Sequence, residues 1–237
     1  MPVPLAQNST RAVIISSLFV NVNRIYMKKN AYYWWLMQTS LAIVLKVLHI
    51  KTKVEGADRI PTNGRFLLVC NHRSVFDPMI TLRVLKKYRV TFISKEENFQ
   101  IPVVGRIIRR CNCLSINRGS SKQSLFIMQK AQAMIQSDLC SVGVYPEGTR
   151  SKDLTLLPFH EGTFFPAVRA KVPVVVCTIV GTENVGKNAP WHKTSVTLKV
   201  LEVIPASYTA EHRMADVSQR ARSDMENDLI IKEADAS

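Results

Sequence analysis

Short apolar runs alternate with longer amphipathic stretches along most of this chain. Continuous apolar or β-branched runs predict buried strands, and longer stretches with a helical repeat predict helices. Strands that alternate with helices are typical of an α/β domain, and we expect a mixed, largely parallel sheet flanked by helices. The expected strands are 66–70, 90–94, 114–117, 141–145, 172–179 and 194–203, and the expected helices are 78–87, 122–137 and 164–170.

The first fifty residues have a different pattern. Residues 12–20 are apolar but form only a short run. Residues 31–50 are long enough to cross a bilayer, but they contain Gln38, Lys46 and His49. Neither segment has the composition of a typical transmembrane helix, although a single span by the second segment stays open.

Charge and aromatic residues favour a membrane surface for the same region. The first acidic residue is Glu55, and seven basic residues precede it; residues 32–35 are all aromatic. We therefore expect residues 1–54 to form a two-helix, membrane-associated element on an anionic cytoplasmic face of the inner or plasma membrane. Residues 55–237 would form the α/β domain. The alternative for the first part is a buried hairpin that packs on that domain.

The formal net charge of +14 predicts anionic partners, which are nucleic acid, anionic lipid or phosphorylated substrates. The basic residues lack interleaved aromatic residues that could stack on bases, so we do not expect nucleic acid. The five cysteines are odd in number and lack metal-binding spacing. They predict free thiols in a reducing compartment and no metal site.

The motif with the clearest chemistry is Asn-His-Arg-Ser-Val-Phe-Asp-Pro at 71–78, directly after the strand expected at 66–70. Sites in α/β sheets are built where strands end. His72 can exchange a proton near neutral pH, and Asp77 can hold its second ring nitrogen and stabilise the imidazolium. The spacing alone is equally compatible with a surface histidine and a helix-capping aspartate.

A second motif, Val-Tyr-Pro-Glu-Gly-Thr-Arg-Ser at 144–151, also follows an expected strand. Its glycine lets the backbone approach a ligand, and Arg150 offers a fork of donors that matches phosphate. The stretch between the two motifs is rich in cations, which are Lys95, Arg106, Arg109, Arg110 and Arg118. Phosphate recognition would explain this excess of positive charge.

Together these residues resemble the four sequence blocks of the glycerolipid acyltransferase family, in particular the 1-acylglycerol-3-phosphate acyltransferases. The blocks correspond to His72–Asp77, Lys95–Arg118, Glu147–Arg150 and Val172–Val176. The chain departs from the family pattern in two places. A valine near Val176 replaces the usual second proline of the fourth block, and the usually basic segment before a glycine reads Phe-His-Glu-Gly at 159–162.

The resemblance implies a role for each matching residue. His72 would be the general base and Asp77 its orienting partner. Arg150, Arg118 and Lys95 would bind the substrate phosphate. His160 could be a second catalytic histidine, but the resemblance gives it no such role.

Glu147, Gly148 and Thr149 would shape the floor of the site or supply oxyanion donors. The implied reaction moves an acyl group from acyl-CoA or acyl carrier protein to the free hydroxyl of lysophosphatidic acid, giving phosphatidic acid in phospholipid biosynthesis. No cofactor is implied beyond this co-substrate. Another lysophospholipid or glycerol 3-phosphate stays open as acceptor. From a different class, a non-catalytic protein that binds anionic lipid or nucleic acid also stays open.

Overall fold

The structure of this chain is a computed structural model, which describes residue 17, residues 20–117 and residues 119–234. The helices are α2 (Ala31–Val47), α3 (Asp77–Val84), α4 (Glu96–Gln100), α5 (Val104–Arg110), α6 (Ser121–Gln136), α7 (Phe165–Ala170), α8 (Val185–Asn188), α9 (Ala206–Glu211) and α10 (Met214–Ala234). The strands are β1 (Ile50–Glu55), β2 (Leu67–Cys70), β3 (Val90–Lys95), β4 (Leu114–Ile116), β5 (Ser141–Val144), β6 (Val174–Val180) and β7 (Thr194–Ile204). Short 3₁₀ turns lie at Ala57–Arg59, Lys86–Tyr88, Glu161–Phe164 and Thr182–Asn184.

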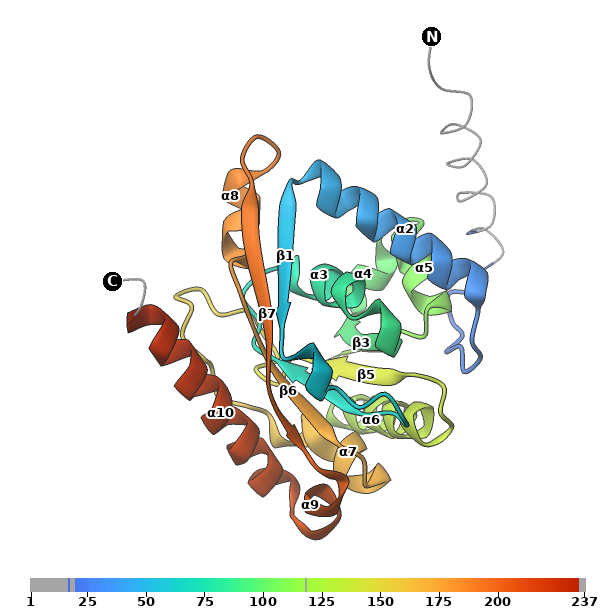
Figure 1. The fold of residues 1–237 in the computed structure, drawn as a ribbon. Coiled ribbons are helices and arrows are strands. Elements are labelled where there is room, and N and C mark those ends of the chain that lie inside the picture. The colour runs from blue at the N-terminus through green and yellow to red at the C-terminus, as the bar shows by residue number, and fades with distance from the viewer. Residues whose placement is uncertain (1–16, 18–19, 118, 235–237) are drawn as a thin grey trace.

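The strands form one sheet in the order β1-β7-β6-β2-β5-β3-β4 (Figure 1). The five strands from β6 to β4 are mutually parallel, whereas β7 is antiparallel to β6 and pairs in parallel with β1. The expected mixed, largely parallel α/β sheet is therefore confirmed. Parallel neighbours end at a common edge, so the loops after β2, β3, β5 and β6 leave the sheet at the same side.

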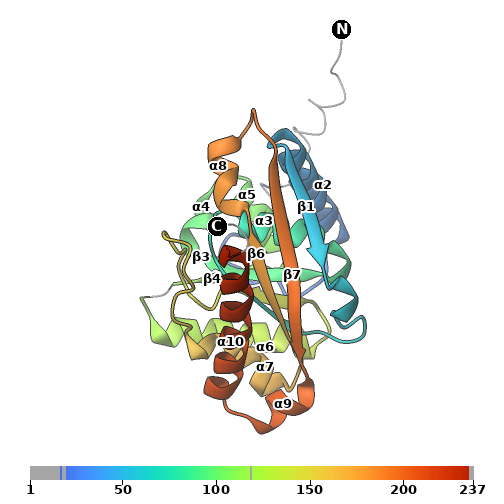
Figure 2. The same cartoon turned by 60° about the vertical axis from the view of Figure 1, so that its left-hand side comes forward.

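Helices cover both faces of the sheet, and β2 in its centre is buried on both (Figures 1 and 2). Leu68 and Cys70 pack with side chains of α2, α3 and α5. Leu67 and Val69 point to the opposite face, where they pack with α6, α7 and α10. This double coverage explains why the strand is apolar at every position instead of alternating.

One element differs from the sequence expectation. Residues 50–55 form an edge strand, β1, where the sequence pattern ended an N-terminal helix. The polar C-terminal residues form the long helix α10, which packs on the sheet. Val217, Ala221 and Met225 recur every fourth residue along α10 and are fully buried against the sheet.

The N-terminal region is described from α2 onward, with Ser17 and residues 20–30 before it. Most of the expected first helix, at 12–20, lies outside the described residues. In α2, Leu36, Leu41 and Leu45 join the core beneath the sheet face. Among the described helices, none has the length and apolarity needed to cross a membrane. The expected division after residue 54 falls inside β1, and it stays a prediction.

Candidate active site

The loop after β2 is anchored to the neighbouring strand before it reaches the candidate residues. The buried side chain of Asn71 donates to the backbone oxygen of Ile179 in β6 at 3.0 Å and accepts from the Ile179 amide at 2.7 Å. Through these two bonds the Asn71 side chain holds the residue after β2 to the backbone of β6. The backbone of His72 consequently starts from a fixed point at the edge of the sheet.

His72 and Asp77 meet as the sequence predicts. The Nδ1 of His72 lies 2.8 Å from Oδ2 of Asp77, and the amides of Arg73 and Ser74 each donate to the same oxygen at 2.7 Å. Asp77 is fully buried at the first position of α3, with Pro78 behind it. One carboxylate oxygen therefore closes the whole turn around the imidazole, and Nε2 is the nitrogen left to exchange a proton.

The imidazole also rests on an aromatic stack. The rings of His72 and Tyr145 are stacked with centroids 4.3 Å apart, and Phe92 stacks on the far side of Tyr145 at 5.1 Å. Burial, assisted by the charge of Asp77, raises the pKa of Tyr145 well above its usual value, so its hydroxyl stays neutral. The sequence pattern assigns Tyr145 no role and places it only at the end of an expected strand.

Glu147 connects the catalytic loop to a second loop. Its carboxylate accepts from the His72 amide at 2.6 Å and from the Leu157 amide at 3.0 Å. Burial raises the pKa of Glu147, and the two amides partly offset that shift. Because one residue spans both loops, it sets the position of the His72 backbone without touching the imidazole.

Gly148 has a positive φ of 70° and lies against His160. A Cβ atom at this position would approach the ring carbon Cδ2 of His160 to 2.9 Å. The Gly148 amide already donates to the Tyr145 carbonyl at 3.0 Å. Its contribution is therefore the shape of the site, since a hydrogen bond within the turn already uses this N–H group.

The expected phosphate ligands differ in placement. Thr149 and Arg150 are exposed in the turn after Gly148, and the next amide, of Ser151, donates to the His72 carbonyl at 2.9 Å. Lys95 is exposed at the end of β3, on the same edge of the sheet. Arg118 lies outside the described residues.

Two cations of the basic stretch pack on aromatic rings. The guanidinium of Arg110 lies 4.4 Å from the ring centroid of Tyr26 and 5.1 Å from that of Tyr33. The guanidinium of Arg109 lies 4.8 Å from the ring of Phe99, and burial lowers the pKa of Arg109. Part of this positive charge therefore holds α5 against α2 and α4.

Arg73, inside the first motif, has a structural place that sequence reasoning missed. Its side chain is largely buried, and Nη2 donates to the Leu154 carbonyl at 3.1 Å. Nη1 lies 4.0 Å from a carboxylate oxygen of Glu183. Arg73 thus ties the catalytic loop to the loop at 151–157 and to the turn after β6.

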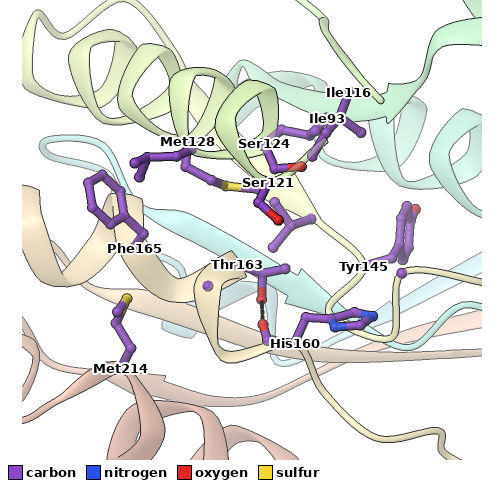
Figure 3. A pocket seen from close by; sticks show the side chains of 14 residues that line it. Ile93, Ile116, Ser121, Ser124, Met128, Tyr145, His160, Thr163, Phe165 and Met214 are labelled. Atoms are coloured by element: carbon purple, nitrogen blue, oxygen red, sulfur yellow. Dashed lines mark hydrogen bonds between the residues drawn. The ribbon is translucent and has the colours of Figure 1, made fainter. Parts of the chain in front are cut away.

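An apolar pocket of about 430 Å³ opens beside the aromatic stack (Figure 3). Tyr145 and His160 lie at one end of the view, and Phe165 and Met214 lie at the other. Its walls are mostly apolar side chains from β3, β4, β5 and α6, including Ile93, Ile116, Val144, Leu125 and Met128. Tyr145 both lines this pocket and stacks on His72, so the pocket ends next to the proton-exchanging group.

A family model described as Acyltransferase matches residues 51–180, which is more than half of the chain and contains His72, Asp77, Tyr145 and Glu147. The chain belongs to the acyltransferase family. The matched range begins within β1 and ends with β6, so it includes six of the seven strands.

Relatives of this acyltransferase carry more specific names. It is 35% identical over 161 residues to the human 1-acyl-sn-glycerol-3-phosphate acyltransferase beta, covering 67% of this chain and 57% of the human one. It is 28% identical over 184 residues to a 1-acyl-sn-glycerol-3-phosphate acyltransferase of Chlamydomonas reinhardtii, covering 76% and 54%. The chain spans about half the length of such curated relatives.

A solved structure agrees over almost the whole chain. The crystal structure of PlsC from Thermotoga maritima, a 1-acyl-sn-glycerophosphate (LPA) acyltransferase, superposes with a TM-score of 0.65 at 25% identity. The match covers 91% of this chain and 88% of the other. The similarity therefore extends beyond the motifs to the arrangement of the elements.

The two departures from the family pattern now have positions in this acyltransferase. Val176 is fully buried in β6, where it pairs with Val69 of β2. His160 stands against Gly148 at the pocket. His160 lines the apolar pocket, whereas Val176 packs inside the sheet and is not among the pocket's lining residues.

Proposed function

We propose that this acyltransferase transfers a fatty acyl group from acyl-CoA or acyl carrier protein to the free hydroxyl of lysophosphatidic acid, giving phosphatidic acid. The observation that carries the proposal is the contact between His72 and Asp77 beside an apolar pocket. The names of the relatives support the choice of acceptor. No metal or redox cofactor takes part in the proposed reaction.

The proposed chemistry is direct transfer. His72 Nε2 takes the proton of the acceptor hydroxyl while that oxygen attacks the thioester carbonyl; Asp77 stabilises the imidazolium that forms. The tetrahedral intermediate then collapses, the carbon–sulfur bond breaks, and the imidazolium returns its proton to the leaving thiolate. The chain has no Gly-x-Ser-x-Gly motif for an acyl-enzyme, and a thioester is activated enough to react without one.

Cations around the edge of the sheet would hold the acceptor phosphate. Arg150 is exposed one residue from Ser151, whose amide is bonded to the His72 carbonyl. Lys95 and Arg118 complete the proposed set. A guanidinium next to a residue that is hydrogen-bonded to the catalytic loop can fix the phosphate while the hydroxyl of the same molecule reaches His72.

The apolar pocket would receive the acyl chain. Its volume lies within the range usual for small-molecule sites, and few of its lining side chains are polar. Phe165 and Met214, at the end of the pocket opposite Tyr145, would then contact the far part of the acyl chain. His160 at the other end would then contact the chain close to its carbonyl.

We also propose that residues 1–54 attach the enzyme to the anionic cytoplasmic face of a membrane. Trp35 is 60% exposed on the outer face of α2, and Tyr32 lies one turn before it. Lysophosphatidic acid is itself a membrane lipid, so an attached enzyme can take it from the bilayer without releasing it into water. Flotation with anionic liposomes tests this step; undiminished binding after removal of residues 1–50 contradicts it.

Thiol release from acyl donors in the presence of a panel of acceptors tests the reaction. We expect release with lysophosphatidic acid, and its loss in His72→Ala with acceptor binding nearly intact. Arg150→Ala should raise the KM for phosphate-bearing acceptors more than it lowers kcat. Near-normal turnover by purified His72→Ala would contradict the mechanism. Release only with another lysophospholipid or glycerol 3-phosphate would change the acceptor, and no release with any acceptor would favour a non-catalytic lipid-binding protein.

A further inference from the structure

Trp191 has the most exposed large apolar side chain in the described part of the chain, at 86%. It lies in the connection between α8 and β7, a segment outside the range matched by the acyltransferase family. The free energy falls when a tryptophan side chain that is almost wholly in water moves into an apolar or interfacial environment. Nothing in the proposed catalytic chemistry uses this residue.

The hairpin tip at 189–193, which carries Trp191, is an ordered turn. The His192 amide donates to the Asn188 carbonyl at 2.7 Å, and the Asn188 side chain donates to the Thr194 hydroxyl at 3.1 Å. These bonds close the tip at its base. The side chain is therefore presented on a fixed support, and less conformational entropy is lost when it binds a partner.

The hairpin tip lies beside the C-terminal end of α2. Thr194 pairs with Ile50, and its amide donates to the His49 carbonyl at 3.2 Å. In both Figure 1 and Figure 2 the tip stands at the same end of the molecule as the junction of α2 and β1. The last turns of α2 expose Ile43 and Val47, at 58% and 57%.

This end of the molecule is also basic. Between Glu183 and Glu202 the chain has no acidic residue, and no acidic residue precedes Glu55. The exposed lysines are Lys46 and Lys51 around the end of α2, and Lys187 and Lys193 around the hairpin tip. Lys53, further along β1, pairs with Glu55 at 2.8 Å. Exposed apolar side chains surrounded by lysines are complementary to an anionic lipid surface. They match a protein groove less well, because such a groove usually carries charges of both signs.

We propose that the hairpin tip and the end of α2 form one lipid-binding surface, with Trp191 inserted into the headgroup region of an anionic bilayer. β6 runs parallel to β2, so the tip and His72 leave the sheet at the same edge. Docking through this surface brings the bilayer to the edge that carries the catalytic loop. The inference rests on the membrane attachment proposed above, and it adds a second contact outside residues 1–54.

Tryptophan fluorescence of the full chain tests this contact. In a Trp34→Phe, Trp35→Phe background, Trp191 is the only reporter. We expect its emission to shift to shorter wavelength on vesicles of phosphatidylcholine with phosphatidylglycerol, and to be quenched by lipids brominated on the acyl chain. Phosphatidylcholine vesicles alone should give a smaller change.

A matched control moves the reporter to α6. Phe126 is an exposed aromatic residue on α6, which lies away from the tip in both views. Phe126→Trp combined with Trp191→Phe in the same background should give no shift and no quenching. Equal quenching of both reporters would show non-specific adsorption and would overturn the proposal.

Vesicle partitioning of variants that keep Trp34 and Trp35 gives an independent measure of the contact. Trp191→Ser should lower partitioning into anionic vesicles by about tenfold, and Lys187→Glu with Lys193→Glu by at least as much. Thiol release with detergent-dispersed substrate should be unchanged in these variants. Vesicle binding without any response of Trp191 would overturn the tip contact and leave the N-terminal attachment standing. A failure of the unaltered chain to bind vesicles would overturn both, and a dimer abolished by Trp191→Ser would identify a second copy as the occupant.

Discussion

Replacement of Asp77 by asparagine separates charge from geometry in the catalytic pair. Oδ2 of Asp77 alone accepts from the His72 ring and from the amides of Arg73 and Ser74. The amide oxygen of asparagine can accept the same three bonds, so the turn should keep its shape. What disappears is the negative charge beside the imidazolium.

The distance sets the size of the effect. Two unit charges 2.8 Å apart interact by about 6 kcal/mol at an effective dielectric constant of about 20, which is an upper limit for the lost stabilisation. A positioned general base is usually worth about 10² to 10⁴ in rate. We therefore expect kcat to fall by about 10² to 10⁴ in Asp77→Asn, with KM changed far less.

The free energy of unfolding should fall by a smaller amount. Oδ1 of Asp77 is buried and has no hydrogen-bond partner within the described residues. The asparagine NH₂ group would occupy this position, and an unsatisfied buried donor costs about 1–3 kcal/mol. Chemical denaturation should register that loss, and the variant should remain folded at assay temperature.

Thiol release by the purified enzyme measures kcat, and circular dichroism checks the fold. Asp58→Asn is the matched control, because Asp58 is an exposed aspartate in the 3₁₀ turn after β1. It should leave turnover unchanged. A folded Asp77→Asn enzyme with nearly normal kcat would refute the role of the carboxylate in stabilising the imidazolium.

Two further predictions test the surroundings of the pair, and a third tests a carboxyl group on α10, away from the site. Tyr145→Phe keeps the ring stack on His72 and should keep most of the activity, whereas Tyr145→Leu should lower kcat in the thiol-release assay; equal rates would show that stacking is unimportant. Gly148→Ala meets both a positive φ and the His160 ring, so it should lower the melting temperature by the equivalent of about 1–2 kcal/mol, and His160→Ala should restore part of that loss. The third change concerns Asp224, whose pKa burial and the neighbouring Glu202 carboxylate raise from 3.8 to about 6. Its charging therefore removes stability as pH rises through about 6, and urea midpoints across that range should fall in wild type relative to Asp224→Asn; parallel profiles would contradict this.

Local features of this protein could be predicted from its sequence. β2 is apolar at every position and β6 at every position except Thr178, because both faces of the sheet are covered, and such runs are visible without a structure. His72 and Asp77 are five residues apart, so a single turn decides their contact. The motif at 71–78 was therefore sufficient to predict the contact between His72 and Asp77 that the structure contains.

Contacts between distant segments could not be predicted in the same way. Tyr145 reaches His72 and Glu147 reaches the His72 amide only because β2 and β5 are parallel neighbours, and strand order is not encoded in either segment alone. The same reason hid the reversed direction of β7 and the edge position of β1.

Tertiary structure also decided what polar segments do. α10 has a narrow buried face among many charged residues, so its sequence resembles an independent solvated helix until the sheet is present to cover it. Arg109 and Arg110 belong to the basic stretch in sequence, but their guanidinium groups pack on aromatic rings. Arg109 packs on Phe99, and Arg110 packs on Tyr26 and Tyr33. The sequence determined which residue types were available for chemistry. Packing decided which of them face the site, because the burial of a side chain depends on neighbours that are distant in the sequence.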